Sequence, residues 1–426
     1  MKTLHIGMIG LGTVGSGVWK ILSEHRALLE SRLGLTLNLK KIAVRDLKKK
    51  RELKIPPGVL TQRVEDIWED PEITLVVEVM GGADNPYPAE ALRRGKHVVT
   101  ANKALLATRG AELLRLAAER GLFVGYEAAV AGGVPIIKAI EESFVGNRIQ
   151  QLYGIINGTA NFILSEMTEQ GKAFPEVLQE AQKLGYAEQD PKMDIEGLDA
   201  AQKLAILVSL CFGTEPHASE IYAEGITRIT PLDIQFAKKF GYVIKLLAVA
   251  KDHQGSIEAR VHPTMVPESH PLAEVDGVFN AIYLKGDAIG ESMFLGRGAG
   301  SLPTASSIVS DVAMLARLTG SGVKAPLIHR AWQSIPYRKM DEIESRYYLR
   351  FSVLDKPGVM AQIAGILGNH AISISSVYQH DRDEGAKVPI VVMTHQAKER
   401  DVQQSLKAIN DLETVVEDAV LIRVEE

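Results

Sequence analysis

The stretch from residue 185 to residue 203 holds the densest group of chemically useful side chains in the sequence. Asp199 and Lys203 stand four residues apart, a spacing that brings two side chains together on one face of a helix. The apolar run at residues 204–208 predicts that this helix continues into a core. The carboxylates that lie near the lysine in the sequence are Glu188, Asp190, Asp194, Glu196 and Asp199.

Two interpretations of this cluster are open. So many carboxylates around one lysine are costly for folding alone, and they suit binding of a small ammonium-bearing substrate beside a group that transfers a proton. The alternative is an exposed ion pair between Asp199 and Lys203, the commonest outcome of this spacing and one of small energetic value. The density of carboxylates favours the substrate site.

A glycine-rich turn near the N-terminus predicts a dinucleotide site. It lies between a predicted buried strand at residues 4–9 and a helical pattern that includes Val18 and Leu22. In such a turn Gly10 makes the tight bend, Gly12 lets the backbone approach a pyrophosphate, and Gly15 lets helix and strand pack closely. The expected cofactor-binding residues of the turn are Gly10, Gly12, Thr13, Val14 and Gly15.

The end of the second predicted strand, at residues 37–44, favours NADP over NAD. Arg45 stands where an acidic residue would bond the 2′-hydroxyl of NAD, and four basic residues follow at 48–51. A guanidinium at this place suits the 2′-phosphate of NADP. The alternative is a solvated basic loop in which Asp46 contacts NAD.

Further predicted strands at residues 74–79 and 97–100 continue an alternating strand and helix pattern, which indicates a doubly wound parallel sheet over about the first 130 residues. Lys103 follows the fourth strand and precedes an apolar helix. Residues just beyond the carboxyl ends of such strands line the ligand crevice, so we expect Lys103 to lie near the nicotinamide and the substrate. The alternative is a surface lysine at a helix start, which the helix dipole disfavours.

A second glycine-rich turn, at residues 126–135, follows the last strand of this pattern. Its free carbonyls, together with Glu127, could coordinate a hard cation through oxygen ligands. From the residues alone, a tight turn between domains is the favoured interpretation of the segment.

The sequence pattern predicts a separate domain in the C-terminal part of the chain. A charged segment at residues 338–346 precedes a strand at 347–354, the turn at 355–358 and a helix at 359–367. Strands at 372–378, 390–394 and 415–424, with a helix around 402–409, complete the order βαββαβ of a ferredoxin-like unit.

Length, composition and charge limit the number of domains and the kinds of partner. The chain has 426 residues, 46% of them hydrophobic and 24% charged, which predicts about three folded domains. The net charge of -5 and the lack of a basic stripe with aromatics argue against a nucleic-acid partner. The single cysteine, Cys211, excludes an intrachain disulfide and a cysteine-rich zinc site. No secretory leader or apolar run of membrane-spanning length is evident, so we expect a cytoplasmic protein without a membrane partner.

Five segments together resemble those of homoserine dehydrogenases. They are the glycine turn at residues 10–15, Ala101-Asn102-Lys103, the segment at 157–164, the segment at 185–203, and Arg297-Gly298-Ala299-Gly300 followed by Pro303-Thr304. The resemblance covers residues 1 to about 320, and the segment at 185–203 is the most specific of the five. It also assigns Asn157-Gly158-Thr159, which matches a glycosylation sequon, to a substrate loop.

The resemblance implies a reaction and a set of site residues. The family interconverts L-aspartate 4-semialdehyde and L-homoserine with NADP or NAD, in threonine and methionine biosynthesis. By position, the residues that hold the amino acid are Gly158, Thr159, Tyr186, Glu188, Asp194 and Asp199. Lys203 and Lys103 are then the catalytic residues at the reacting oxygen, and Gly300 lies against the cofactor. A monovalent cation such as Na⁺ is implied at Glu127, Val130, Gly132 and Val134, largely through main-chain oxygens.

The implied chemistry is hydride transfer from the nicotinamide to the aldehyde carbon. Lys203 would protonate the developing alkoxide, with electrostatic support from Lys103. The competing hypothesis is a catalytically silent amino-acid sensor, but such a protein should have lost Lys203 or Glu188, and both are present.

The segment from residue 355 onward looks like an ACT domain, a regulatory module that commonly binds amino acids at paired interfaces. We expect L-threonine to act there, near residues 355–358 and near Asn369 and His370 of a second copy, on a catalytic part that works without it. A dimerising domain without a ligand is the alternative. The expected organisation is a Rossmann domain at 1–130, a mixed α/β catalytic and dimerisation domain at 131–320, a helix and linker at 321–346, and an ACT domain at 347–426, in a homodimer or homotetramer.

Overall fold

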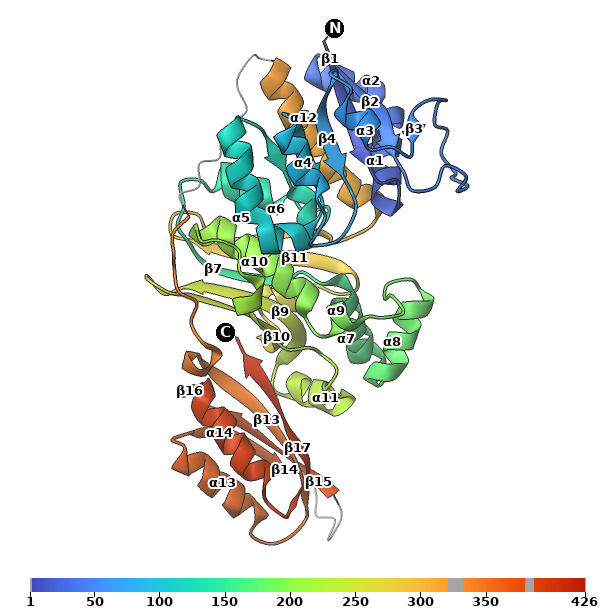
Figure 1. The fold of residues 1–426 in the computed structure, drawn as a ribbon. Coiled ribbons are helices and arrows are strands. Elements are labelled where there is room, and N and C mark those ends of the chain that lie inside the picture. Colours follow the sequence, from blue (N-terminus) through green and yellow to red (C-terminus); the bar gives the residue numbers. More distant parts are fainter. Residues whose placement is uncertain (1, 321–331, 380–386, 426) are drawn as a thin grey trace. The chain divides into compact units, whose positions relative to one another are not determined.

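The computed structural model describes residues 2–320, 332–379 and 387–425. The chain forms two compact units, and each is built from three separate segments of the sequence. Figure 1 shows the whole chain, coloured along the sequence. The first unit comprises Met1–Gln150, Gln202–Ser219 and Phe279–Ser334, and the second comprises Gln151–Ala201, Glu220–Val278 and Ile335–Glu426. Of the predicted linker at 321–346, residues 321–331 lie outside the described part of the chain.

The first unit contains a parallel six-stranded sheet with the strand order β3-β2-β1-β4-β5-β6. Its strands are β1 (Thr3–Ile9), β2 (Thr36–Ala43), β3 (Leu60–Thr61), β4 (Ile73–Glu78), β5 (His97–Thr100) and β6 (Val124–Gly125). Its helices are α1 (Thr13–Glu24), α2 (Arg26–Leu33), α3 (Glu65–Trp68), α4 (Tyr87–Arg93), α5 (Lys103–Arg120), α6 (Ile136–Lys138) and α12 (Ser301–Gly320). The predicted doubly wound sheet is confirmed.

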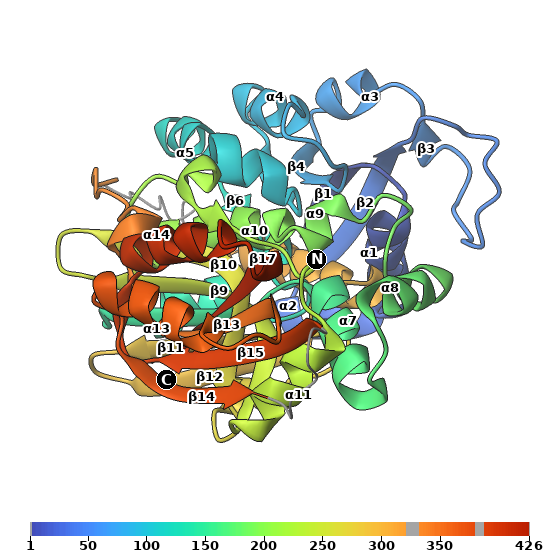
Figure 2. The same ribbon diagram turned by 90° about the horizontal axis from the view of Figure 1, so that it is seen from below.

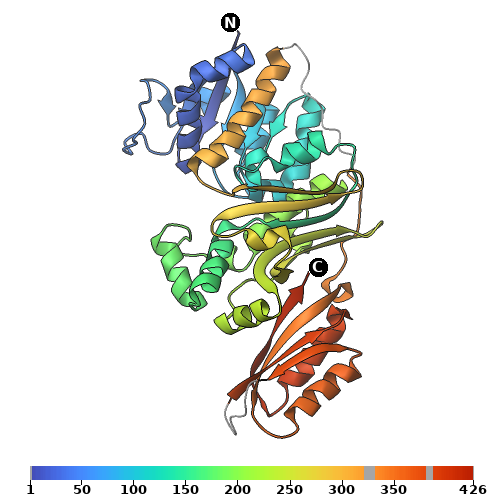
Figure 3. The ribbon, with the colours of Figure 1, turned by 180° about the vertical axis from the view of Figure 1, so that it is seen from behind.

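Helices cover both faces of this sheet, which is why its strands are apolar on both sides. Along β1, Leu4, Ile6 and Met8 join one core with buried residues of α1 and α12. The opposite face at Gly7 meets Ile67 of α3, whose side chain lies 2.5 Å from the position that a Cβ would occupy. Figure 3 shows α12, far from α1 in sequence, beside the same sheet.

The first unit also contains the hairpin of β11 (Phe279–Gly286) and β12 (Gly290–Arg297), which pair antiparallel. Short helical turns at Glu127–Ala129 and Ala139–Ser143 flank α6. Helix α10 (Leu198–Phe212) begins with residues of the second unit and continues with residues of the first.

In the second unit seven strands form one sheet in the order β7-β9-β10-β17-β13-β15-β14. They are β7 (Ile149–Ile155), β9 (Tyr242–Asp252), β10 (Ile257–Pro267), β13 (Glu344–Leu354), β14 (Ile374–Gln379), β15 (Lys387–Thr394) and β17 (Val415–Val424). The short strands β8 (Tyr222–Ala223) and β16 (Ala397–Lys398) pair with β10 and β13. The helices are α7 (Gly158–Gln170), α8 (Phe174–Lys183), α9 (Lys192–Ile195), α11 (Pro231–Lys239), α13 (Val359–Asn369) and α14 (Glu399–Asn410), with turns at Ala218–Glu220, Pro271–Glu274 and Met340–Glu342.

The predicted βαββαβ order of the C-terminal part is confirmed. Helices α13 and α14 lie side by side over strands β13, β14 and β15 (Figure 2). The apolar side chains between these layers form a core of their own, with Phe351, Ile363 and Val402 fully buried.

The C-terminal region, which has its own core, also shares a sheet with the preceding part of the chain. Strand β17 pairs in parallel with β10, with Thr264 opposite Arg423 and Met265 opposite Val424. The sheet therefore continues from one part into the other, because an open edge of β10 offers unpaired backbone groups that a neighbouring strand can bond.

Candidate active site

Asn157 is the centre of the predicted substrate segment. Its Nδ2 donates to Asp194 Oδ1 at 2.7 Å and to Asp199 Oδ2 at 2.8 Å. Its Oδ1 accepts from the backbone N–H of Ala160 at 2.8 Å and so caps the N-terminus of α7. One buried amide thus joins two carboxylates that are distant in the chain to the helix start at Gly158.

Tyr186 lies against the same helix start. Thr159 Oγ1 donates to the carbonyl oxygen of Tyr186 at 2.7 Å, and the Tyr186 ring lies 4.9 Å from the ring of Phe162, between centroids. The structure therefore brings five of the six predicted substrate residues together: Gly158, Thr159, Tyr186, Asp194 and Asp199. Glu188 is on the same exposed loop as Tyr186, and its carboxylate makes no hydrogen bond or ion pair with the described residues.

Asp199 and Lys203 are both on α10 and both are buried, at 3% and 9% exposure. Their spacing of four places them on one face of the helix. The alternative of an exposed surface pair is therefore wrong.

The glycine turn has the geometry that a pyrophosphate needs. Gly10 has φ +105°, and its N–H donates to the carbonyl of Ala43 at 3.0 Å. No atom lies within 4 Å of the position of a Cβ at Gly12, whereas a Cβ at Gly15 would lie 2.5 Å from the carbonyl oxygen of Gly10. No side chain caps α1, so its first N–H groups, at Thr13 and Val14, are left for an anionic ligand. These residues fit a dinucleotide.

Arg45 lies two residues beyond the end of β2 and is exposed. Its guanidinium forms no ion pair with the described residues, and its carbonyl accepts from Gln62 Nε2 at 2.9 Å. The Asp46 carboxylate accepts from the backbone N–H of Lys48 at 2.7 Å, which fixes the turn of the basic loop. Arg45 is thus the side chain in this pair that is available to a phosphate.

Lys103 is the first residue of α5, directly after the cap residue Asn102. Asn102 Oδ1 accepts from the N–H of Leu105 at 3.1 Å, and its own N–H donates to Thr100 Oγ1 at 3.0 Å. Thr100 Oγ1 donates to Glu78 Oε2 at 2.6 Å. The position of Lys103 therefore depends on a carboxylate that the sequence did not single out.

Glu78 ends β4 and is fully buried. Besides Thr100 it accepts hydrogen bonds from Asn85 Nδ2 at 2.8 Å and from the N–H of Met80. Burial raises its pKa to about 7, although these three hydrogen bonds oppose the rise. Glu78 ties the loop after β4 to the turn after β5, at the carboxyl edge of the sheet.

Glu127, the predicted cation residue with a side-chain oxygen, is buried. Its two carboxylate oxygens accept from the N–H groups of Ile137 and Lys138, each at 2.9 Å. Its own N–H donates to Asp311 Oδ2 at 3.0 Å, and Lys138 Nζ lies 2.8 Å from Asp311 Oδ1. Burial raises the pKa of Glu127 to about 7.

The other predicted cation residues, Val130, Gly132 and Val134, form the turn after Glu127. Ala131 and Gly132 both have φ +52°, so two consecutive residues adopt the left-handed conformation. Glycine is required at 132 because a Cβ there would overlap the carbonyl of Gly298. The carbonyl oxygens of Gly132 and Val134 accept hydrogen bonds from Ser307 Oγ at 2.7 Å and from the N–H of Ile136 at 2.9 Å, so a cation at this turn would share these oxygens with their donors. No cluster of three or more His, Cys, Asp or Glu side chains suited to a metal occurs in the described ranges.

Gly300 precedes α12 and has φ +118°, a conformation that favours glycine. Its carbonyl accepts from the N–H of Thr304 at 3.3 Å, and Ser301 Oγ donates to the carbonyl of Thr13 at 2.7 Å. The start of α12 thus lies against the start of α1, where the pyrophosphate is expected.

Comparison with known proteins decides the family. Family models described as "Homoserine dehydrogenase, NAD binding domain", "Homoserine dehydrogenase" and "ACT domain" match residues 10–127, 135–313 and 347–414. The homoserine dehydrogenase of Bacillus subtilis is 42% identical over 435 residues, covering 100% of this chain and 99% of the relative. The chain belongs to the homoserine dehydrogenase family.

Solved structures of homoserine dehydrogenases agree. One from Thiobacillus denitrificans matches with a TM-score of 0.92 and 42% identity over 100% of this chain and 99% of that one. A hyperthermophilic archaeal homoserine dehydrogenase in complex with NADPH matches with a TM-score of 0.63 and 27% identity, over 74% of this chain and 98% of that chain.

The resemblance seen in the sequence is therefore confirmed, and so is the fold class. Homoserine dehydrogenases are NAD(P)-dependent oxidoreductases that act on a CH–OH group, and this enzyme carries the NAD-binding, catalytic and ACT regions. Within the described residues, no helix has both the length and the apolar character to cross a membrane.

Three residues of this homoserine dehydrogenase hold others in place in a way that the sequence did not indicate: Glu78 and Asp311, which it did not single out, and Asn157, which it assigned only to the substrate loop. Asn157 stands at a helix-cap position, which could have indicated its role. Glu78 and Asp311 lie within apolar runs, where a lone carboxylate requires partners. That requirement was the available signal.

Proposed function

We propose that this enzyme reduces L-aspartate 4-semialdehyde to L-homoserine, reversibly and with NADP. The observation that carries the proposal is the pair of hydrogen bonds from the Asn157 amide, which hold the carboxylates of Asp194 and Asp199 at the start of α7. Lys203 follows Asp199 by one helical turn on α10. A fixed carboxylate pair suits the substrate ammonium group, and a buried lysine suits proton transfer.

In this proposal each group has one task. Asp194, Glu188 and Asp199 take up the α-ammonium group, while Gly158, Thr159 and Tyr186 enclose the rest of the amino acid. Lys203 gives a proton to the oxygen of the reduced aldehyde, and in the reverse direction it accepts the hydroxyl proton. Lys103 supports the negative charge that develops on that oxygen. The bound nicotinamide supplies or takes the hydride.

The preference for NADP rests on Arg45. Arg45 is exposed two residues beyond the end of β2, whereas the Asp46 carboxylate accepts a hydrogen bond from the N–H of Lys48. A guanidinium can donate two parallel N–H···O hydrogen bonds to the oxygens of a 2′-phosphate. An archaeal relative was solved with NADPH, which is in keeping with this choice. We further propose that a monovalent cation such as Na⁺ is held at Glu127, Val130, Gly132 and Val134.

The C-terminal region is proposed to sense L-threonine. The turn at residues 355–358 lines a cleft of about 300 Å³ together with Gln379 and Ile390. Gly358, with φ +90°, precedes α13 there, and no side chain caps the N–H groups at the start of this helix. Asn369 and His370 of a second copy would complete the site, which requires a homodimer or homotetramer. The domain limits given above, and a cytoplasmic location, stay predictions.

One assay tests the core of the proposal. Purified full-length protein is given L-homoserine with NADP or NAD, and formation of the reduced cofactor is followed by absorbance, with and without L-threonine. We expect oxidation of homoserine, a higher kcat/KM with NADP, and inhibition by threonine. Absence of homoserine oxidation with both cofactors would refute the proposed reaction. Absence of any response to threonine would leave only a dimerising role for the C-terminal region.

A further inference from the structure

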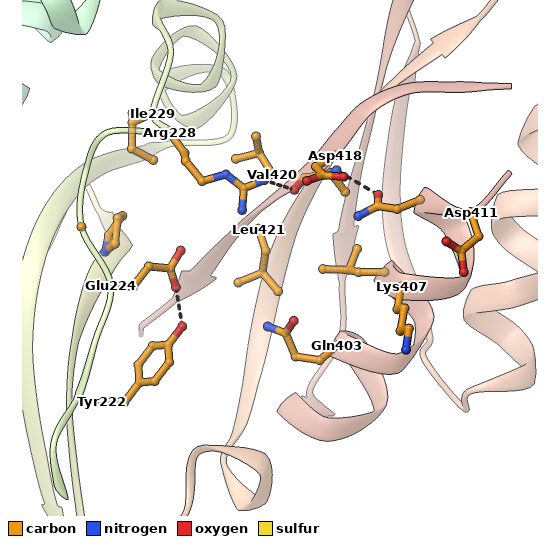
Figure 4. Close-up of a pocket in the computed structure, with 15 residues that line it drawn as sticks. Tyr222, Glu224, Arg228, Ile229, Gln403, Lys407, Asp411, Asp418, Val420 and Leu421 are labelled. Atoms are coloured by element: carbon orange, nitrogen blue, oxygen red, sulfur yellow. Dashed lines mark hydrogen bonds between the residues drawn. The ribbon is translucent and has the colours of Figure 1, made fainter. Parts of the chain in front are cut away.

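A second cleft, of about 460 Å³, lies within the second unit and away from the turn at residues 355–358. One wall is the loop from Tyr222 to Ile229, and the other is formed by α14 and by residues 418–421 of β17 (Figure 4). Its volume is within the range of small-molecule sites. Neither wall belongs to the predicted substrate or cofactor residues.

Two opposite charges stand at one rim of this cleft. Arg228 donates from Nη2 to the carbonyl of Ala419 at 2.8 Å, which places its guanidinium beside the backbone that follows Asp418. The other guanidinium donors of Arg228 and the carboxylate of Asp418 have no partner among the described residues. Both side chains are exposed to solvent and can meet a ligand.

The charged residues that line the cleft limit which ligands can bind there. Glu224, Asp411 and Asp418 supply three carboxylates against two cations, Arg228 and Lys407. A polyanion such as a nucleotide would meet more negative charge than positive. A zwitterion with one carboxylate and one ammonium group matches the rim, because each of its charges has an opposite partner there.

Buried apolar side chains form the inner surface of the cleft. Ile229 comes from the loop, Leu406 from α14 and Leu421 from β17. They offer a contact for an aliphatic side chain of the occupant.

We propose that this cleft is a regulatory site for an L-α-amino acid. The α-carboxylate binds Arg228, the ammonium group binds Asp418, and the side chain lies on Leu406 and Leu421. The inference rests on the proposed function, in that it names a second place where an amino acid acts on this enzyme. The site is formed within one chain, unlike the site expected at residues 355–358.

The loop wall of the cleft contacts the substrate segment directly. Ile226 N–H donates to the carbonyl of Ile195 at 2.9 Å, and Gly225 lies so close to that carbonyl that a Cβ would overlap it. Ile195 follows Asp194, which Asn157 holds at 2.7 Å. A movement of the loop therefore shifts the backbone next to a predicted substrate carboxylate.

The other wall is bonded to the loop through Arg423, which is buried with Glu399, while Glu224 is partly exposed. Arg423 of β17 bonds Glu224 of the loop through Nη1 at 2.7 Å and Glu399 of α14 through Nε at 2.9 Å. A carboxylate bound by the remaining donors of Arg228 and an ammonium group bound by Asp418 add a second link between the loop and β17, beside the bond from Arg228 to the Ala419 carbonyl. The ligand thereby changes how the loop is held, and affinity for it must be linked to affinity for homoserine.

The test is calorimetric titration of the full-length protein with each of the twenty common L-amino acids, on preparations whose homoserine oxidation has been measured. We expect binding of at least one of them, weakened ten- to a hundredfold by Arg228→Gln and by Asp418→Asn, since each removes a charge-assisted contact. The control is Arg400→Gln, which removes an exposed cation of α14 that does not line the cleft. It should leave the binding unchanged. Adding homoserine should change the Kd of the amino acid in the wild type.

Two results would overturn the inference. One is that a preparation that oxidises homoserine binds none of the amino acids. The other is that binding persists unchanged in both Arg228→Gln and Asp418→Asn, for example because it depends on Lys356 at the other cleft. A preparation that does not oxidise homoserine refutes the proposed function instead, so the two failures are distinguishable.

Discussion

Arg350 of β13 and Asp233 of α11 form a buried ion pair, with Arg350 Nε 2.6 Å from Asp233 Oδ1. Tyr348 Oη donates to the same oxygen at 2.9 Å, and Thr230 shares the other oxygen through the capping box of α11. The C-terminal βαββαβ region is therefore joined to a helix of the preceding sequence by a carboxylate with no contact to water.

Asp233→Ala should destabilise the protein by about 3 to 5 kcal/mol, because it leaves a buried guanidinium without its counter-charge. The measurement is the urea midpoint of the second unit, followed by tyrosine fluorescence. Glu112→Ala breaks an exposed pair with Arg109 and should shift stability by less than about 1 kcal/mol. Equal effects of the two variants would contradict the burial argument.

Lys203→Ala should lower turnover on the order of 10²- to 10⁴-fold while cofactor affinity stays near that of the wild type. The reason is that the change removes the proposed proton donor and leaves the glycine turn intact. Steady-state kinetics and cofactor titration measure the two quantities. Lys192→Ala, at an exposed lysine of α9, is the control. If Lys203→Ala keeps most of its turnover, the proton comes from another group.

Arg45→Ala should reduce the preference for NADP over NAD about ten- to a hundredfold, the worth of one charged contact. The ratio of the two kcat/KM values is the measurement. Lys54→Ala removes an exposed cation of the same loop and serves as the control. An unchanged ratio in Arg45→Ala would assign the 2′-phosphate elsewhere.

Glu78→Gln should make stability less dependent on pH. Burial raises the pKa of Glu78 from 4.5 to about 7, so the folded state binds its proton more tightly than the unfolded state does. The cost of ionising Glu78 is absent below pH 4.5, grows as pH rises and is complete above pH 7. Between pH 5 and pH 8 the wild type should lose about 2 to 3 kcal/mol that the variant does not lose.

Thermal unfolding of the wild type and of Glu78→Gln at both pH values measures this difference. Glutamine keeps an acceptor for Met80 and Asn85, and its amide can donate to Thr100. Parallel pH profiles for the two proteins would show that Glu78 is ionised in both states.

A chain that ends before Tyr347 should be poorly soluble and should melt at a lower temperature than the full protein. Truncation removes β17 from the edge of β10 and leaves the fully buried Arg260 without Glu425. Soluble yield, melting temperature and homoserine oxidation measure the outcome. This differs from the expectation of a catalytic part that works alone, and Lys356→Gln in the full chain is the safer test of threonine sensing. A truncated protein with wild-type melting temperature would restore the modular picture.

Local pattern in the sequence sufficed for several features. The glycine turn between strand and helix, the βαββαβ order and the segment at 185–203 all depend on residues within about one supersecondary unit of one another. In such units turn chemistry and apolar periodicity act over short distances. That is why the predicted strands of the C-terminal region start and end within about three residues of the observed ones.

Only the tertiary structure decided how these units are joined. Asn157 reaches Asp194 and Asp199 across 37 and 42 residues, Arg350 meets Asp233 across 117, and β17 pairs with β10. No periodicity marks such contacts, because any buried carboxylate needs a partner and any strand edge can accept a neighbour. Which partner and which edge meet depends on the packing of the whole unit, and that packing also creates the cleft at Arg228.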